Sequence, residues 1–333
     1  MPESARPVWL VEEGIGETRA ILVEDGAIRA ARVEWDTRLR AGLVAEAQLV
    51  SRRAGSKRGT VRLPDGTEAL ADALGPEATE GTTLTVRVTR SPITERGRSK
   101  LAHVRPAPGE QPRAAPPLAD ALAADGTPVV RAAPGDSRFD RAGWDEIVEE
   151  ALWGEIAFPG GALLVSPTPA MTLIDIDGDD APRQLALAAV PAIAATLARL
   201  DLGGSVGIDF PSLAEKKDRQ AVDAALADAL SGWRGERTAM NGFGFVQLVS
   251  RFERPSIVQL YSRKPSAAAR ILMRRAERVR EPGALLLVAH PAVRHMVKPE
   301  WEAMLANRTG RGIVWRDDPG LALTAAFAQA IAP

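Results

Sequence analysis

Two aspartates at the ends of short apolar runs are the residues most able to do chemistry in this sequence. Asp175 lies in the run 172–177 and Asp209 in the run 205–210, and each run predicts a buried strand. The apolar stretch between them predicts the helix that joins two parallel strands. Such a unit presents the carboxyl ends of its strands at one edge of the sheet, so the two carboxylates should lie side by side. A hard divalent cation is the natural ligand of such a pair.

The composition limits the classes of protein to consider. The chain has 333 residues with 45% hydrophobic and 5% aromatic content, enough for two or three domains. It has no Cys, which excludes disulfides, thiolate nucleophiles and Cys-based zinc sites and favours a reducing compartment. We find neither a signal pattern nor a membrane-spanning run, so we expect a cytoplasmic protein without a membrane partner. A net charge of −1 argues against indiscriminate coating of nucleic acid but leaves room for local basic patches.

Short strands dominate the first third of the chain. Residues 9–33 alternate apolar and polar side chains around the turn 24–26, which predicts a hairpin. From residue 42 to 104 the pattern repeats in short strands, which predicts a small β-barrel. Residues 106–117 are rich in Pro, Ala and Gly, and they mark a linker and a domain boundary.

The rest of the chain mixes helices and strands. Helical spacing in residues 140–153 leads into the apolar strand 162–165 and then the Asp175 strand. In the last segment we expect an Arg-rich helix over residues 267–279 and a buried strand over residues 284–289. A helix starting at Pro299 and a final strand over residues 312–315 follow. The fold class is therefore α/β, or α+β overall.

Several motifs follow one another along the chain. The core motifs are Ile174-Asp175, Asp201-Leu202-Gly203-Gly204, Ile208-Asp209-Phe210, Phe243-Gly244, Ser250-Arg251 and Arg254-Pro255-Ser256. The outer motifs are Ser91–Gly97, Val288–Pro291 and Arg308–Arg311. Together these motifs resemble the ribonuclease E/G family, and the last two are similar to its ribonuclease G branch. The resemblance implies five parts: an N-terminal hairpin (1–34), an S1-like RNA-binding barrel (35–105), a linker and reduced connecting region (106–139), a catalytic core (140–258) and a small C-terminal α/β domain (259–333).

The resemblance also implies an activity. Members of the family are endoribonucleases that cut single-stranded RNA with Mg²⁺, in RNA processing or decay. Asp175 and Asp209 fall on the metal-ligand positions, where Mg²⁺, or Mn²⁺ in its place, would activate a water for attack on the phosphodiester. Cleavage in the family leaves a 5′-phosphate and a 3′-hydroxyl.

The chain departs from the family pattern in three places. Asp177 stands where the family usually has Asn, and this third carboxylate either strengthens metal binding or repels the RNA phosphate. The Cys pair of the family's zinc link is missing, so any oligomer is not zinc-linked. In the barrel, residues 60–62 and 69–70 stand where the family has Phe side chains that stack on bases. Each stacked base contributes about 1–3 kcal/mol to the binding free energy.

Basic residues are the candidate RNA contacts. Arg234, Arg251 and Arg254 fall near positions where the family meets RNA, although exposed Arg side chains are also ordinary solvated surface. Arg96 and Lys100 belong to a set of barrel cations that predicts a basic face, with surface solubility as the alternative.

Other conspicuous residues have plainer interpretations. His103, His290 and His295 match no metal-ligand spacing, and we assign them no catalytic role. We expect Trp233 and Phe243 to be packing residues of the core.

Two further hypotheses compete with the nuclease. An RNA-binding protein with weak or lost cleavage would account for Asp177, the missing aromatics and the missing zinc link. A metal nuclease that acts on DNA is disfavoured by the RNA-type barrel.

Overall fold

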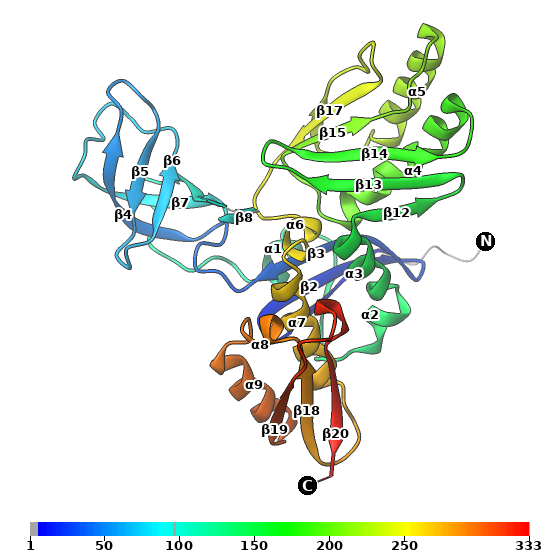
Figure 1. Cartoon of the computed structure of the whole chain (residues 1–333). Coiled ribbons are helices and arrows are strands. Elements are labelled where there is room, and N and C mark those ends of the chain that lie inside the picture. Colours follow the sequence, from blue (N-terminus) through cyan, green and yellow to red (C-terminus); the bar gives the residue numbers. More distant parts are fainter. Residues whose placement is uncertain (1–5, 96–97, 333) are drawn as a thin grey trace.

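The computed structural model describes residues 6–95 and 98–332, and Figure 1 shows how the parts are arranged. The first strands form a hairpin-based sheet: β1 (Val8–Glu13), β2 (Glu17–Glu24) and β3 (Ala27–Trp35). The turn from β2 to β3 is Asp25-Gly26, and both residues have positive φ, 50° and 79°. This is the two-residue turn that the Asp-Gly pair predicts, because its twist matches that of the strands.

A closed five-stranded barrel follows, as predicted. Its strands run in the order β10-β6-β5-β4-β7, and their bounds are β4 (Val44–Arg52), β5 (Gly59–Arg62), β6 (Glu68–Ala71), β7 (Thr83–Arg90) and β10 (Ala102–Pro106). Small and branched side chains such as Ala47, Val61 and Ala69 fill its interior. A short hairpin, β8 (Ile93–Glu95) and β9 (Arg98–Lys100), precedes the last strand.

The segment 106–139, assigned to a linker and connecting region by sequence, contains three elements. They are α1 (Leu118–Ala123), β11 (Val129–Ala132) and α2 (Ser137–Arg141). β11 pairs in parallel with β1 and completes a four-stranded sheet of order β11-β1-β2-β3. The short apolar run of β11 gave no signal of a strand pairing with a segment more than a hundred residues earlier.

A six-stranded mixed sheet carries the two aspartates. Its order is β12-β13-β14-β15-β17-β16, with the bounds β12 (Glu155–Phe158), β13 (Gly161–Pro167), β14 (Thr172–Gly178), β15 (Ser205–Asp209), β16 (Gly235–Arg237) and β17 (Phe245–Ser250). α3 (Trp144–Trp153) leads into the sheet, α4 (Pro182–Arg199) joins β14 to β15, and α5 (Lys216–Ala229) follows β15. Only the β14–β15 pairing in this sheet is parallel, as the strand-helix-strand pattern predicts.

The last part of the chain forms a three-stranded sheet with helices beside it. Its elements are α6 (Ile257–Tyr261), α7 (Lys264–Glu277), β18 (Ala284–Ala289), α8 (Pro291–Arg294), α9 (Pro299–Thr309), β19 (Ile313–Asp317), the 3₁₀ turn Leu323–Ala325 and β20 (Phe327–Ile331). β18 lies between a parallel β19 and an antiparallel β20. In the described part of the chain, no helix is long and apolar enough to cross a membrane.

A buried cluster of charges joins the N-terminal sheet to α7. Arg19 donates from Nε and Nη2 to the two carboxylate oxygens of Glu12, each at 3.1 Å. Arg274 on α7 forms an ion pair with Glu17 at 3.2 Å, and both side chains are more than 90% buried. Burial, with the nearby Arg274 next, lowers the pKa of Arg19 to about 10. Burial also raises the pKa of the neighbouring Tyr261 to about 12. Arg19 therefore stays protonated across the physiological pH range, and Tyr261 stays neutral.

We predict that Arg274→Met destabilises the protein by about 3–5 kcal/mol, because it leaves the Glu17 carboxylate buried without its partner. Urea denaturation measures the free energy of unfolding. The double variant Glu17→Gln/Arg274→Met should recover part of the loss, because it removes both charges. Arg280→Met, at an exposed position just beyond α7, is the control and should change stability by no more than about 0.5 kcal/mol. A loss below about 1 kcal/mol for Arg274→Met would contradict a stabilising role for the pair.

Candidate active site

The two aspartates predicted to bind metal lie on neighbouring strands. Asp175 of β14 and Asp209 of β15 are direct partners in the parallel register, and both side chains are exposed. Adjacent strands are about 4.8 Å apart, so the two carboxylates start from neighbouring positions. Ile174 and Ile208, the residues before them, are fully buried among the side chains of the core. The alternation of the strands therefore packs the isoleucines inside and turns the carboxylates to the open face of the sheet.

These carboxylates have few partners within the protein. Asp175 Oδ1 accepts a hydrogen bond from the backbone N–H of Ile176, at 3.0 Å. In the ranges 6–95 and 98–332, no cation pairs with Asp175 or Asp209. Two adjacent carboxylates without a cation form a site of negative charge, and a divalent ion would neutralise it.

Asp177 lies on the same face of β14 as Asp175, two residues further along, opposite Ala162 of β13. Among the described residues, however, no three Asp, Glu or His side chains gather in a way that could hold a metal ion. The donor set that the structure offers is therefore the pair Asp175 and Asp209. This pair suits Mg²⁺, which is usually bound by one or two carboxylates and keeps several waters.

An apolar surface lies beside the carboxylates on the open face. Phe245 of β17 is the partner of Asp209 in the antiparallel register. Its ring extends over Gly207, where an added Cβ would lie 2.5 Å from Phe245 Cζ and 2.9 Å from Met171 Sδ. Glycine at 207 therefore lets an aromatic ring lie close to the sheet, next to the strand end that carries Asp209.

Two helices begin just after the strands that carry the carboxylates. α4 starts at Pro182 and α5 at Lys216, so the positive ends of both helix dipoles lie on the side of the sheet where the carboxyl ends of β14 and β15 emerge. Arg183 in the first turn of α4 pairs with Asp218 in the first turn of α5, at 3.1 Å. Lys216 is exposed at the start of α5. The sequence predictions did not include Arg183 and Lys216. Their positions shortly after the two aspartate strands could have indicated that they lie near the carboxylates.

The loop between β16 and β17 is fixed from two sides. Asp223 of α5 accepts from Arg237 Nη1 at 2.6 Å and from the backbone N–H of Met240 at 2.9 Å. Asn241 Oδ1 accepts from the backbone N–H groups of Phe243 and Phe245, at 2.9 and 3.0 Å. The hydrogen bond from Arg237 is the main cause that lowers the pKa of Asp223, and the one from Met240 acts in the same direction.

The two aromatic residues expected to pack have different environments. Trp233 is partly buried and packs against the main hydrophobic core, as predicted. The prediction for Phe243 was wrong, because its side chain is 88% exposed at the tip of the β16–β17 loop. The loop is closed by backbone and Asn241 hydrogen bonds, which the sequence pattern did not reveal.

Three of the predicted RNA contacts come together in one groove. Arg234, Arg251 and Arg254 line it together with Arg87 and Arg105 of the barrel. The groove lies near the amino end of β15. Ser205, the first residue of β15, pairs with Val249 near the end of β17, and Arg251 of the groove comes directly after β17. From Ser205 to Asp209 the strand extends about 13 Å, so these cations are not next to the carboxylates.

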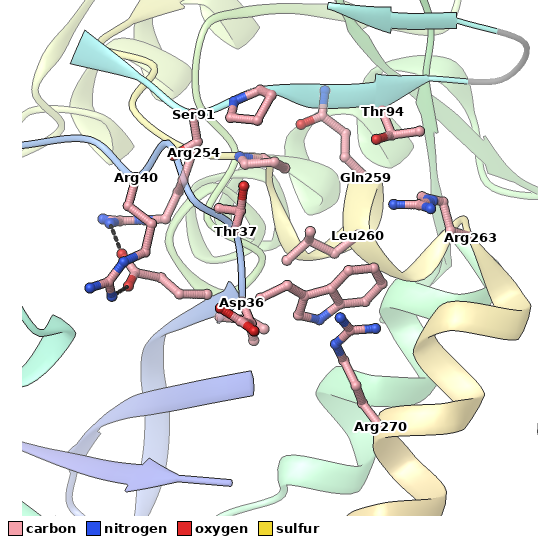
Figure 2. A pocket seen from close by; sticks show the side chains of 15 residues that line it. Asp36, Thr37, Arg40, Ser91, Thr94, Arg254, Gln259, Leu260, Arg263 and Arg270 are labelled. Atoms are coloured by element: carbon pink, nitrogen blue, oxygen red, sulfur yellow. Dashed lines mark hydrogen bonds and ion pairs between the residues drawn. The ribbon is translucent and has the colours of Figure 1, made fainter. Parts of the chain in front are cut away.

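Arg254 pairs with two neighbouring acids, which also pair with Arg32 and Arg40. Its Nε donates to Asp201 at 2.9 Å and its Nη1 approaches Glu34 at 3.4 Å. Burial opposes the charge of Arg254, but Asp201 and Glu34 outweigh it and raise the pKa. Figure 2 shows Arg254 with Arg40, Arg263 and Arg270 around a small pocket of about 190 Å³ between β3, the β8 strand and the helices α6 and α7. Arg254 therefore acts in this structure as a link between the core and the N-terminal sheet.

One other predicted contact, Lys100, lies on the barrel hairpin. Lys100 of β9 donates to the backbone carbonyl of Pro169 at 2.8 Å, in the connection that precedes β14. Ser91 donates its backbone N–H to the carbonyl of Glu253 at 2.8 Å. The barrel is thus attached near the amino ends of β14 and β15, and in Figure 1 these two strands point away from it. Arg96 lies outside the described residues.

The fold and the site define a mixed α/β protein with a small closed β-barrel and a pair of carboxylates on adjacent parallel strands. Residues 115–251 match the model of the Ribonuclease E/G family, a family of endoribonucleases. The matched segment includes Asp175, Asp177 and Asp209, so the predicted resemblance to this family is confirmed over residues 115–251. The match does not resolve the ribonuclease G branch. No curated protein matches the sequence.

We predict that Asp223→Asn lowers stability near neutral pH and that the difference from the wild type shrinks in acid. A carboxylate with a depressed pKa in the folded protein stabilises it above the unfolded pKa of about 3.9, and this contribution is lost as the pH falls through the lower folded value. Urea unfolding at pH 6 and pH 3 measures both differences. The control is Asp228→Asn, on the same helix at an exposed position. An equal loss of stability at both pH values would show that the Asp223 charge is not the cause.

Proposed function

We propose that this protein is a Mg²⁺-dependent endoribonuclease that cleaves single-stranded RNA. The observation that carries the proposal is the direct pairing of Asp175 with Asp209 on the open face of the sheet, inside the segment that matches the family. As in other members, cleavage would leave a 5′-phosphate and a 3′-hydroxyl, and the cellular role would be RNA processing or decay. A cytoplasmic location remains a prediction.

Asp175 and Asp209 would hold the metal ion, with Mn²⁺ as an alternative to Mg²⁺. Such an ion, when bound, would supply a Lewis acid that activates water and offsets the negative charge that develops on the phosphate oxygens. The two aspartates would also repel a phosphodiester on their own, so neutralising their charge is a condition for RNA to approach. The amino-terminal ends of α4 and α5 supply positive potential on the same side, which favours the binding of a phosphate group there.

Asp177 adds a third negative charge to this face. Because it lies one pleat beyond Asp175, we propose that it acts on the reaction through the electrostatic potential or an outer-sphere water. An RNA-binding protein with weak or lost cleavage is the alternative, and the absence of a three-carboxylate cluster among the described residues is compatible with it.

We propose that RNA binds along the groove between barrel and core. Arg234 is exposed there, and Arg251 is exposed with one partner, Glu253, at 2.8 Å. Lys100 on the barrel hairpin and Arg96 remain proposed contacts. Arg254 contributes by holding the wall of the groove, since its guanidinium group is already bound to Asp201 and Glu34.

We predict that Asp175→Asn and Asp209→Asn each reduce cleavage of a labelled single-stranded RNA at least about 100-fold, because a bound metal supplies several kcal/mol to the transition state. The measurement is the rate of cleavage with Mg²⁺ and with EDTA. Asp179→Asn, an exposed carboxylate just after β14, is the control and should retain most activity.

The competing functions give different results in the same assay. A wild-type protein that binds RNA but cuts none, over several substrates and both metals, would replace the nuclease by the binding function. Faster cleavage of a labelled single-stranded DNA than of the RNA would assign the activity to DNA.

We predict that Arg234→Ala and Arg251→Ala weaken RNA binding and reduce its dependence on salt. Each lost phosphate contact should lower the slope of log affinity against log salt by about 0.7. Fluorescence anisotropy at several salt concentrations gives the slope. The control is Arg316→Ala, which removes the same charge from an exposed position on β19. An unchanged slope in both groove variants would exclude the groove as the RNA path.

A further inference from the structure

Phe243 is an exposed aromatic ring beside the candidate active site. Most of the aromatic side chains in the described chain are buried or half-buried, and the two that are exposed are Trp153 (64%) and Phe243 (88%). Trp153 has a neighbour on its ring, because Lys264 Nζ lies 4.0 Å from the ring centroid. Phe243 belongs to none of the hydrophobic clusters. Its ring therefore contributes little to the stability of the fold.

The loop holds this ring at a defined place. Besides the two hydrogen bonds to Asn241 Oδ1, the carbonyl of Gly244 accepts from the backbone N–H of Phe210 at 3.2 Å. Gly244 has φ of 88°, and an added Cβ would lie 3.0 Å from the carbonyl oxygen of Phe210. Phe210 directly follows Asp209, so the loop is tied to the strand end that carries the carboxylate.

The position is close to the proposed metal pair. Phe245 is the partner of Asp209 on the neighbouring strand. Phe243 precedes Phe245 by two residues, so their Cα atoms are at most about 7 Å apart. A nucleotide whose phosphate lies at Asp175 and Asp209 would thus have its base, or the base of its neighbour, within reach of the ring.

The barrel gives an independent reason to look for a stacking residue in the core. Residues 36–105 contain no Phe, Tyr or Trp, so the barrel offers no aromatic ring for bases. Stacking on aromatic side chains is a common source of affinity for single-stranded nucleic acids and tolerates any base. A duplex keeps its bases stacked on one another and offers no free base face at this point.

We propose that Phe243 is a base-stacking residue that holds one nucleobase of single-stranded RNA next to the scissile phosphate. The proposal rests on the proposed function for the reaction itself, but the stacking contact can be measured without cleavage. It also assigns a reason for the preference for single strands, since only an unpaired base can lie on the ring.

Binding is tested with a set of short RNAs, each of which carries 2-aminopurine at a different position. The fluorescence of 2-aminopurine decreases when the base stacks on a ring. The titrations use the full chain with Ca²⁺ in place of Mg²⁺, to separate binding from cleavage. We expect quenching at one position with the wild type, its loss in Phe243→Ala, and its return in Phe243→Trp. The affinity of Phe243→Ala should fall about 5- to 100-fold. Trp153→Ala removes the other exposed aromatic residue and should behave as the wild type.

Cleavage with Mg²⁺ provides the second measurement. Phe243→Ala should lower kcat/KM for the RNA by a similar factor. An RNA that lacks the base at the quenched position should be cleaved with a lower kcat/KM by the wild type. For Phe243→Ala, the loss of that base should cause no further decrease in kcat/KM. Phe243→Ala should unfold at the wild-type urea concentration, because the ring is exposed.

The outcomes separate this inference from the proposed function. If the wild type cuts RNA and Phe243→Ala binds and cuts it equally well, the stacking inference is wrong and the nuclease stands. If the wild type cuts nothing but the quenching depends on Phe243, the stacking residue stands and the nuclease is wrong. A wild type that neither binds nor cuts RNA overturns both.

Discussion

The parallel pairing of β14 with β15 is the constraint on which the candidate site depends. Its register sets Asp175 opposite Asp209, and the crossover helix α4 must then cover one face of the sheet. The covered face takes up Ile174, Ile208 and their neighbours into the largest hydrophobic core. A shift of one residue in this register would turn the carboxylates into that core, where an unpaired charge is costly. The burial of the isoleucines therefore fixes the position of the charges.

Sequence reasoning reached the elements whose signal is local. The Asp25-Gly26 turn, the barrel strands, α4 and the strands of both aspartates all follow from alternation, turn residues or helical spacing. The parallel order of β14 and β15 followed because a helix-length stretch joins them.

The features that were missed depend on partners distant in the sequence. β11 becomes a strand because β1 offers it an edge, and nothing within Val129–Ala132 shows this. Phe243 looks like a core residue by type, but Asn241 and Gly244 close the loop so that the ring points to solvent. Arg254 looks like a phosphate contact by position, yet its guanidinium group already pairs with Asp201 and Glu34. In each case the outcome is set by tertiary contacts that neither composition nor spacing encodes.

The interior contacts between the first strands and α7 affect when the protein can complete its folding during synthesis. Arg270 Nε donates to the carbonyl of Gly16 at 3.0 Å, across 254 residues of sequence, and the Glu17–Arg274 pair spans a similar interval. At ribosomal rates of roughly 5–20 residues per second, Glu17 waits on the order of 10 to 50 seconds for its partner. During that time the first sheet carries an acid that it cannot bury, so a nascent chain that stops before α7 exposes an incomplete interior. Until α7 has been synthesised, the first strands therefore remain open to the cell's proteases and chaperones.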